Sequence, residues 1–236
     1  MIPIQAIDAV VARSAALAVA QKPAAAAFLV SVTESDLTKA LLIAPALIVA
    51  WYWAGDTAVR RSDVLATIAS CALALVGVWC VTTVWLRPRP IAPDAGLAAI
   101  GSVFLPHFEH SPDFRWGCFP SDHIAYLATL AFGVGRLELG MGRIAWAIVA
   151  VQACARLAVG LHYLSDVAAG VVLAALIHHG VFRIVRIQER AATDRLAAIV
   201  SGSRWLQLGL ILVVVEMATF FREIRFLDGL IFGGAH

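Results

Sequence analysis

The sequence of 236 residues has few charged side chains, since Asp, Glu, Lys and Arg together make up only 14% of it. That is too little to cover the surface of an ordinary soluble domain, because 61% of the residues are hydrophobic. The net charge of +2 and the lack of a basic tract argue against nucleic acid as a partner. The composition therefore indicates a protein whose surface faces lipid.

Paired cysteines are also missing, because the four cysteines show no spacing typical of a disulfide framework or a zinc site. Cys71, Cys80 and Cys154 fall within apolar segments, and Cys118 stands alone in a more polar loop. We therefore expect no disulfide and no metal site. No internal repeat or low-complexity tract is present either.

Long apolar segments dominate instead, and the mean hydropathy is +0.85. A membrane-spanning helix needs about 20 mostly apolar residues, because the bilayer core offers no water to free backbone groups. We predict an all-α fold, a polytopic membrane helical bundle of about six transmembrane helices. The predicted spans are Ser35 to Ala54, Asp63 to Leu86, Asp122 to Leu139, Gly142 to Leu161, Asp166 to Val185 and Trp205 to Phe221.

The segment 1–34 does not reach spanning length, because charged residues interrupt it. These residues are Asp8, Arg13 and Lys22. Ile4, Ile7 and Val11 have the spacing of one helix face, which predicts an amphipathic helix lying in the membrane interface. The alternative is a cleaved signal peptide, because Ala18 to Ala20 resembles a cleavage site, although the leading positive charge is missing.

Threading the spans through a bilayer assigns each loop to one of two sides. Arginines gather mostly on one side, which the positive-inside rule makes cytoplasmic. They are Arg60, Arg61, Arg136, Arg143, Arg183, Arg186, Arg190, Arg195 and Arg204. The division is then an interfacial segment 1–34, a catalytic membrane domain 35–222 with an extracytoplasmic loop 87–120, and a tail 223–236. The polar residues of 87–123 and 160–166 meet on the outer side.

The first polar motif is "TVWLRPRPI", Thr83 to Ile91, where the second span ends. The planar guanidinium groups of Arg87 and Arg89 match phosphate oxygens and stay charged at any working pH. Pro88 and Pro90 stiffen the chain around Arg89. The alternative is that both arginines merely extend toward the head groups from a helix end.

The second motif is "PSDH", Pro120 to His123, at the start of the third span. Ser121 is a favourable N-cap and Asp122 suits a first turn, so a helix begins here. Its N-terminus offers free N–H groups and partial positive charge to a phosphate, and His123 can exchange a proton near neutral pH. The alternative is simple capping beside an interfacial histidine.

The third motif is "ARLAVGLHYLSD", which contains Arg156, His162 and Asp166. A neutral imidazole can attack phosphorus, and a carboxylate on its other nitrogen fixes the tautomer. Asp166 can supply that carboxylate if the chain turns after Gly160. Capping of the fifth span would explain Asp166 but neither His162 nor Arg156.

Together, Arg89-Pro90, Pro120 to His123, and Arg156-x5-His162-x3-Asp166 resemble the three signature motifs of the type 2 phosphatidic acid phosphatase (PAP2) superfamily. The resemblance covers the chain from about Thr82 to Asp166. It implies that His162 attacks phosphorus to form a phosphohistidine, that Asp166 orients it and that His123 protonates the leaving oxygen. It implies further that no metal or other cofactor takes part. The expected phosphate-holding residues are Arg89, Arg156 and Ser121.

Three positions depart from the family's pattern. Thr82 stands where the first motif normally has lysine, and Arg87 could replace that cation in substrate binding. Asp122 stands where glycine is usual, where it would repel a phosphate unless it pairs with Arg87 or Arg89. Ala155 replaces a serine and removes one hydroxyl donor. Bacterial undecaprenyl pyrophosphate phosphatases of the superfamily look similar at Asp122.

The expected function is therefore an integral membrane phosphatase of the bacterial inner membrane, with its site facing the periplasm or exterior. The expected substrate is a membrane lipid phosphate, first an isoprenoid pyrophosphate such as undecaprenyl pyrophosphate. Alternatives are phosphatidic acid, phosphatidylglycerol phosphate or lipid A, a phosphotransferase, and a non-enzymatic membrane protein. His107 and His110 invite a metal-site interpretation that the flexible loop disfavours. Glu216 is a membrane-embedded ionisable residue, either functional or packed against a polar neighbour.

Overall fold

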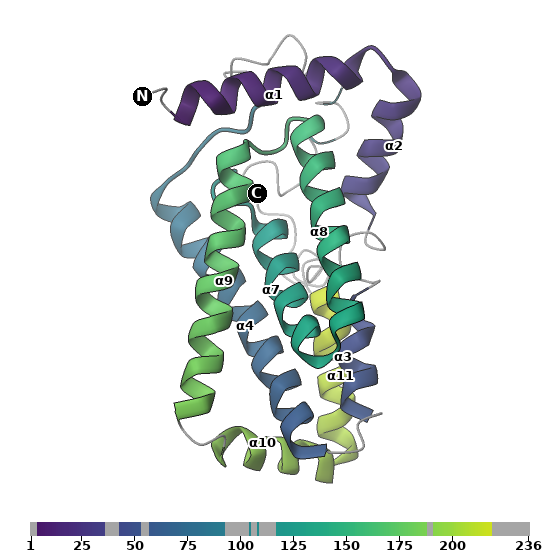
Figure 1. The fold of residues 1–236 in the computed structure, drawn as a ribbon, viewed down its shortest axis with the longest axis vertical. Coiled ribbons are helices and arrows are strands. Elements are labelled where there is room, and N and C mark those ends of the chain that lie inside the picture. The colour runs from purple at the N-terminus through teal and green to yellow at the C-terminus, as the bar shows by residue number, and fades with distance from the viewer. Residues whose placement is uncertain are drawn as a thin grey trace, which may run out of the picture.

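The computed structural model describes residues 4–35, 43–52, 57–92, 104, 108, 117–187 and 191–218. Helices dominate this part of the chain, and no strand occurs within it. The helices are α1 (Ile4–Ala20), α2 (Pro23–Glu34), α3 (Pro45–Tyr52), α4 (Thr57–Val84), α7 (Asp122–Leu137), α8 (Leu139–Ala158), α9 (Leu164–Ile187), α10 (Ala191–Gly202) and α11 (Arg204–Ala218). The predicted all-α bundle is thus confirmed (Figure 1).

Helix α7 is the centre of the bundle, because it packs against α4, α8 and α9 (Figure 1). Nearly every side chain from His123 to Val134 is buried. Close approach is possible because Gly133 has no side chain: a Cβ there would lie 2.1 Å from Cγ2 of Thr67 on α4. The helix that carries the second motif is therefore held on several sides.

Within the described residues, three helices are long and apolar enough to cross a membrane. They are Arg60–Val84, Leu139–Ala158 and Leu164–Arg186. The count rises to five if each of two bent helix pairs is one span. The predicted span 122–139 is the 16-residue α7, and 35–54 is described only in part, as α3. Helix α11 corresponds to the last predicted span.

The N-terminal segment consists of α1 and α2, whose axes are bent by 120°. Helix α1 lies across one end of the bundle, as an interfacial helix would (Figure 1). Its buried residues are Asp8, Ala12 and Ala16, while Ile4 is 68% and Val10 65% exposed. The charged Asp8 therefore faces the protein, and the large apolar side chains face outward. The prediction of an amphipathic helix did not say that Asp8 would face the protein.

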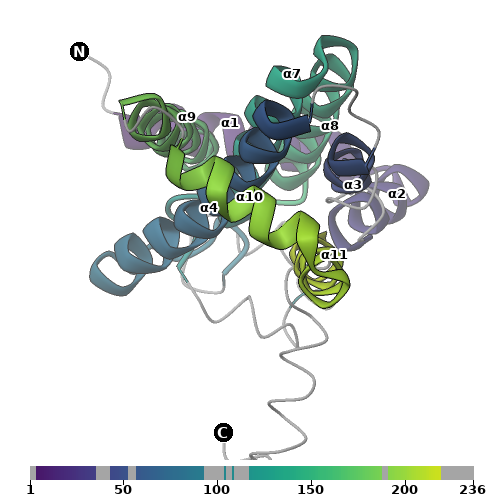
Figure 2. The ribbon, with the colours of Figure 1, turned by 90° about the horizontal axis from the view of Figure 1, so that it is seen from below.

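The opposite end of the bundle is crossed by α10, which runs from the end of α9 toward α11 beneath α4 (Figure 2). The hydroxyl of Ser62 on α4 donates to the carboxylate of Asp194 on α10. Arginines that the sequence assigns to the cytoplasmic side lie on elements at this end. Among them are Arg60 at the start of α4, Arg136 at the end of α7, Arg143 at the start of α8, and Arg204 at the start of α11.

Candidate functional site

The three polar motifs lie side by side, because backbone hydrogen bonds join the segments that carry them. The first motif is bonded to the third and to Cys118, two residues before the second motif, and the second motif is bonded to the third. These bonds run from Cys118 N to Arg87 O (2.9 Å), from Ile91 N to Gly160 O (3.2 Å) and from Ser121 N to Asp166 O (3.1 Å). The convergence predicted from the sequence is therefore present at one end of the bundle.

A tight turn between α8 and α9 holds the nucleophile candidate. Gly160 has a φ of 75°, a conformation that L side chains rarely adopt. A Cβ there would also lie 2.3 Å from Cγ2 of Ile91. The turn is closed by Leu161 N, which donates to Arg156 O over 2.9 Å. It returns the chain to the same end of the bundle and places His162 on a short link.

His162 is 1% exposed, and its two ring nitrogens have different surroundings. Nδ1 lies 2.9 Å from the carbonyl oxygen of Cys118 and 3.7 Å from Oδ2 of Asp166. Both neighbours are acceptors, so Nδ1 carries the proton. Nε2 is buried and has no hydrogen-bond partner in the described part of the chain. The lone pair on Nε2 is therefore available for attack on an electrophile.

The electrostatics of this link favour a neutral imidazole. Burial lowers the pKa of His162 from its usual 6.5, and the charges of Arg89 and Arg156 lower that pKa further. Asp166 and Asp122 act in the opposite direction on the same pKa but do not reverse the shift. Both arginines thus lie close enough to act on the histidine, and a neutral ring is the nucleophilic form.

Asp166 is fully buried, and both of its carboxylate oxygens are engaged. Oδ2 accepts from the backbone N–H of Tyr163 over 2.7 Å, which caps the first turn of α9. Oδ1 accepts from Nη1 of Arg87 over 2.6 Å. The capping and orienting roles considered for Asp166 are therefore compatible, because the capped carboxylate still lies beside His162.

Arg87 makes contacts that sequence reasoning did not foresee. Besides Asp166, its guanidinium donates to Ser165 Oγ over 2.7 Å and to Asp8 Oδ2 over 2.8 Å. It also lies over the ring of Tyr163, 4.1 Å from the centroid. Arg87 thus pairs with Asp166 and Asp8 and not with Asp122. Its direct contact with a substrate phosphate stays a prediction.

His123 and Asp122 form a pair at the start of α7. His123 Nδ1 lies 2.7 Å from Asp122 Oδ1, and the backbone N–H of His123 donates to the same oxygen over 2.7 Å. The sequence suggested two roles for the Asp122 carboxylate, repulsion of the substrate and pairing with an arginine. Pairing with His123 is a third role. The carboxylate can only accept, so Nδ1 of His123 donates to it and the contact fixes the orientation of the ring.

The expected phosphate-holding residues are all buried at this end of the bundle. Arg89 donates from Nη1 to Leu161 O over 3.1 Å, and Arg156 donates from Nη2 to Thr33 O over 3.3 Å. Their exposed fractions are 7% and 4%. Ser121 occupies the N-cap of α7, but its hydroxyl makes no capping bond and has no partner among the described residues. That hydroxyl is free to meet a ligand.

Thr82 and Cys118 support the loop that leads into α7. Thr82 Oγ1 donates to the carbonyl oxygen of Phe119 over 3.4 Å, and Cys118 Sγ donates to Pro88 O over 3.3 Å. Burial raises the pKa of the Cys118 thiol well above its usual range, so it stays protonated. Sequence reasoning missed the Cys118 carbonyl, and no sequence signal marks a backbone acceptor.

Other candidates from the sequence are not among the residues that form this site in the described part of the chain. His107 and His110 lie outside the described residues, as do Glu109 and Asp113. Within the described residues, no group of three or more His, Cys, Asp or Glu side chains could hold a metal ion. Glu216 is half-buried on α11.

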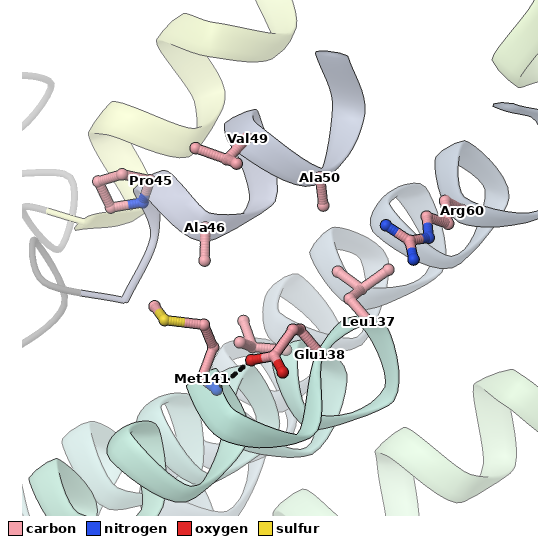
Figure 3. Close-up of a pocket in the computed structure, with 9 residues that line it drawn as sticks. Pro45, Ala46, Val49, Ala50, Arg60, Leu137, Glu138 and Met141 are labelled. Atoms are coloured by element: carbon pink, nitrogen blue, oxygen red, sulfur yellow. Dashed lines mark hydrogen bonds between the residues drawn. The ribbon is translucent and has the colours of Figure 1, made fainter. Parts of the chain in front are cut away.

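A cavity of about 390 Å³ lies near the opposite end of the bundle, between α3, the start of α4 and the α7–α8 turn (Figure 3). Apolar side chains such as Val49, Leu137 and Met141 line it, with Arg60 and Glu138 as the charged exceptions. None of the three motifs contributes to it.

Comparison with known proteins agrees with this site. A sequence model described as the PAP2 superfamily matches residues 63–190, more than half of the chain and the part that holds all three motifs. No curated protein and no solved structure shows significant similarity to the chain. The chain therefore belongs to the PAP2 superfamily, whose membership implies phosphatase activity on phosphate esters, often those of lipids.

Proposed function

We propose that this protein is an integral membrane lipid phosphatase that works through a phosphohistidine on His162. The observation that carries the proposal is the buried Nε2 atom of His162, which has no hydrogen-bond partner among the described residues. Nδ1 of the same ring faces two acceptors. A buried imidazole with one nitrogen fixed and the other open is arranged for nucleophilic attack.

In the first step, His162 Nε2 attacks the terminal phosphorus and the bond from that phosphorus to the leaving oxygen breaks. The leaving group is the lipid monophosphate if the substrate is a pyrophosphate, and the lipid alcohol if it is a monoester. The proton on Nδ1 stays in place, so the ring gains positive charge. The carboxylate of Asp166, 3.7 Å away, and the Cys118 carbonyl stabilise that charge. His123, paired with Asp122, donates its proton to the leaving oxygen.

In the second step, water attacks the phosphohistidine and gives one proton to His123. The P–N bond breaks, inorganic phosphate leaves, and the electron pair returns to Nε2. Both histidines regain their starting protonation states, so the cycle balances. The residues therefore account for complete turnover without a metal ion, which is part of the proposal.

The transferring phosphoryl group carries negative charge, and the residues around His162 offer matching donors. Arg89 and Arg156 act on the pKa of His162 from nearby, and Ser121 has a free hydroxyl. The N-terminus of α7 adds partial positive charge next to Ser121. We infer that these groups hold the phosphate oxygens.

The surface beside the site supports a lipid substrate. Val84, Trp85 and Leu86 lie in the first motif directly before Arg87 and are 88%, 61% and 68% exposed. Such a surface beside a phosphate site suits a ligand with an apolar chain. The arginines at the far end of the bundle favour an extracytoplasmic site in a bacterial plasma membrane.

Among lipid phosphates, we propose an isoprenoid pyrophosphate such as undecaprenyl pyrophosphate as the substrate. The support is the Asp122 variant of the second motif and the outward orientation inferred from the arginines. Phosphatidic acid, phosphatidylglycerol phosphate and lipid A are the alternatives. Each differs in head group, so a panel of substrates separates them.

The test uses the full chain purified in detergent, with a chelator present, against that panel. We expect phosphate release with the chelator, fastest from the isoprenoid pyrophosphate, and none with His162→Ala. Quenching in alkaline denaturing detergent during turnover should trap a phosphoenzyme that is stable in base and labile in acid, as a phosphohistidine is. Labelled acceptor lipids added to the assay reveal phosphotransfer if it occurs.

Two outcomes would end this proposal. One is phosphate release that is equal in the wild type and in His162→Ala. The other is a phosphoenzyme whose label resides on a residue other than His162.

A further inference from the structure

Helix α1 presents one small-residue stripe to the bundle. Asp8, Ala12 and Ala16 are buried at intervals of four residues, and α1 packs against α8 and α9. Figure 1 shows the helix lying across the end of the bundle that holds the site. The alanines permit close approach, and Asp8 extends this contact to the start of α9.

Asp8 is 2% exposed, and its contacts bind it to two distant segments. Oδ1 accepts from Ser165 N over 3.0 Å, and Oδ2 accepts from Ser165 Oγ over 2.5 Å. Oδ2 also accepts from Nη2 of Arg87 over 2.8 Å. A buried carboxylate is costly unless it is paired and hydrogen-bonded, and Asp8 is both.

The same guanidinium joins Asp8 to the carboxylate beside the nucleophile. Arg87 Nη1 donates to Asp166 over 2.6 Å while Nη2 donates to Asp8. Asp166 in turn lies 3.7 Å from His162 Nδ1. Hydrogen bonds connected in this way strengthen one another and limit the positions that each side chain can take.

We propose that Asp8 is a positioning residue: from helix α1 it holds Arg87 and the first turn of α9, and so fixes Asp166 against His162. Asp8 acts on this arrangement through two residues, Arg87 and Ser165 of the first turn of α9. This inference deepens the proposed function, because its kinetic readout is the phosphatase reaction. It makes α1 part of the catalytic machinery and not only a surface helix.

The primary variant is Asp8→Asn, which keeps the size of the side chain and removes its charge. We expect kcat to fall by about 10-fold to 100-fold, as for other groups that orient a ligating or attacking histidine. KM should change less than about threefold, because the phosphate-holding residues are untouched. Asp8→Glu restores the charge and should recover part of the loss. The matched control is Arg13→Gln, an exposed residue of α1, which should leave kcat unchanged.

A loss of folded protein alone would not produce this pattern. The size of the phosphoenzyme burst measures the concentration of active sites. Dividing the rate by that concentration gives kcat per active molecule, so a smaller folded fraction does not lower the measured kcat. Asp8→Asn should also cost less once Arg87→Gln is present, because part of its effect passes through Arg87. Additive losses, or a wild-type kcat per competent site in Asp8→Asn, would overturn the inference.

A second readout does not depend on any substrate. Nitrogen-15 NMR of labelled histidine in lipid nanodiscs reports which ring nitrogen carries the proton, with His162 assigned by comparison with His162→Gln. We expect a single Nδ1–H tautomer in the wild type and a mixture of tautomers in Asp8→Asn. Identical spectra would refute the positioning role. If no lipid is hydrolysed but the tautomer changes, the proposed function fails and this inference stands.

Discussion

The Nδ1 atom of His162 lies 2.9 Å from the carbonyl oxygen of Cys118, a residue 44 positions earlier in the chain. This contact assigns the proton to Nδ1 and leaves Nε2 as the atom that would attack in the proposed mechanism. It also joins the loop just before the second motif to the third motif. The predictions below start from this arrangement.

His123 is expected to act as the proton donor, and the leaving group tests that role. His123→Gln should lower the rate with a lipid monophosphate such as phosphatidic acid by about 10²-fold to 10⁴-fold, because its alkoxide leaving group needs a proton. With p-nitrophenyl phosphate the leaving group needs no proton, so the first step should stay fast. Rapid-quench kinetics should then show a burst of one p-nitrophenolate per enzyme followed by slow turnover.

The slow phase in that experiment reflects the second step, in which His123 accepts a proton from water. His162→Ala is the control, because it should show neither burst nor turnover. A His123→Gln enzyme that loses the first step equally with both leaving groups would contradict the assignment.

The pH dependence of kcat/KM should reflect the pKa of His162. Burial, aided by Arg89 and Arg156, lowers that pKa below 6.5. The neutral, attacking form therefore persists below pH 6.5, and the acid limb of the profile lies there. Arg156→Gln removes one of the charges that lower the pKa, so its acid limb should move to higher pH while kcat/KM also falls.

Arg143→Gln, at the far end of the bundle, serves as the control and should leave the limb in place. Ionisation of the substrate affects the wild type, Arg156→Gln and Arg143→Gln equally. A difference between their acid limbs therefore comes from the enzyme. An acid limb that stays fixed or moves to lower pH in Arg156→Gln would argue against the electrostatic account of His162.

Cys118→Ala tests whether the thiol or the backbone of residue 118 matters. The carbonyl remains in the variant, so kcat should stay within about threefold of wild type. Loss of the bond from Sγ to Pro88 O should lower the free energy of unfolding by about 1 kcal/mol. Steady-state kinetics and unfolding in a denaturing-detergent titration measure the two effects. A large loss of kcat with normal stability would point to thiol chemistry instead.

Gly160→Ala should damage both stability and activity. The positive φ and the contact with Ile91 should cost about 1–3 kcal/mol of unfolding free energy. Because the turn carries His162, kcat should fall as well. Gly180→Ala is the matched control, since a Cβ there meets nothing within 4 Å. Its expected effect is a gain of up to about 1 kcal/mol from helix propensity, and equal effects in both variants would contradict the account.

Several parts of the fold and site follow from sequence because they depend on local pattern. Apolar length predicts α4, α8 and α9, and a proline-serine pair predicts the start of α7. The motif predicts that a turn after Gly160 places Asp166 beside His162. Convergence follows because alternating spans return the chain to the same side of the membrane.

Other parts depend on contacts between distant segments, which no local pattern records. Asp8 meets Arg87 and Ser165 across 79 and 157 positions of the chain. In the sequence, Asp8 only interrupts an apolar run, so its inward direction could not be deduced. Likewise, Asp122 could have paired with arginine as easily as with His123, since both choices satisfy its charge.

The acceptor that faces His162 Nδ1 belongs to the main chain, and every amino acid has such an oxygen. Codon changes at position 118 can therefore alter the side chain without erasing the group that sets the tautomer. Only a shift in the path of the peptide could remove it. Related sequences could therefore differ in the side chain at position 118 while all of them keep the carbonyl oxygen in the same place.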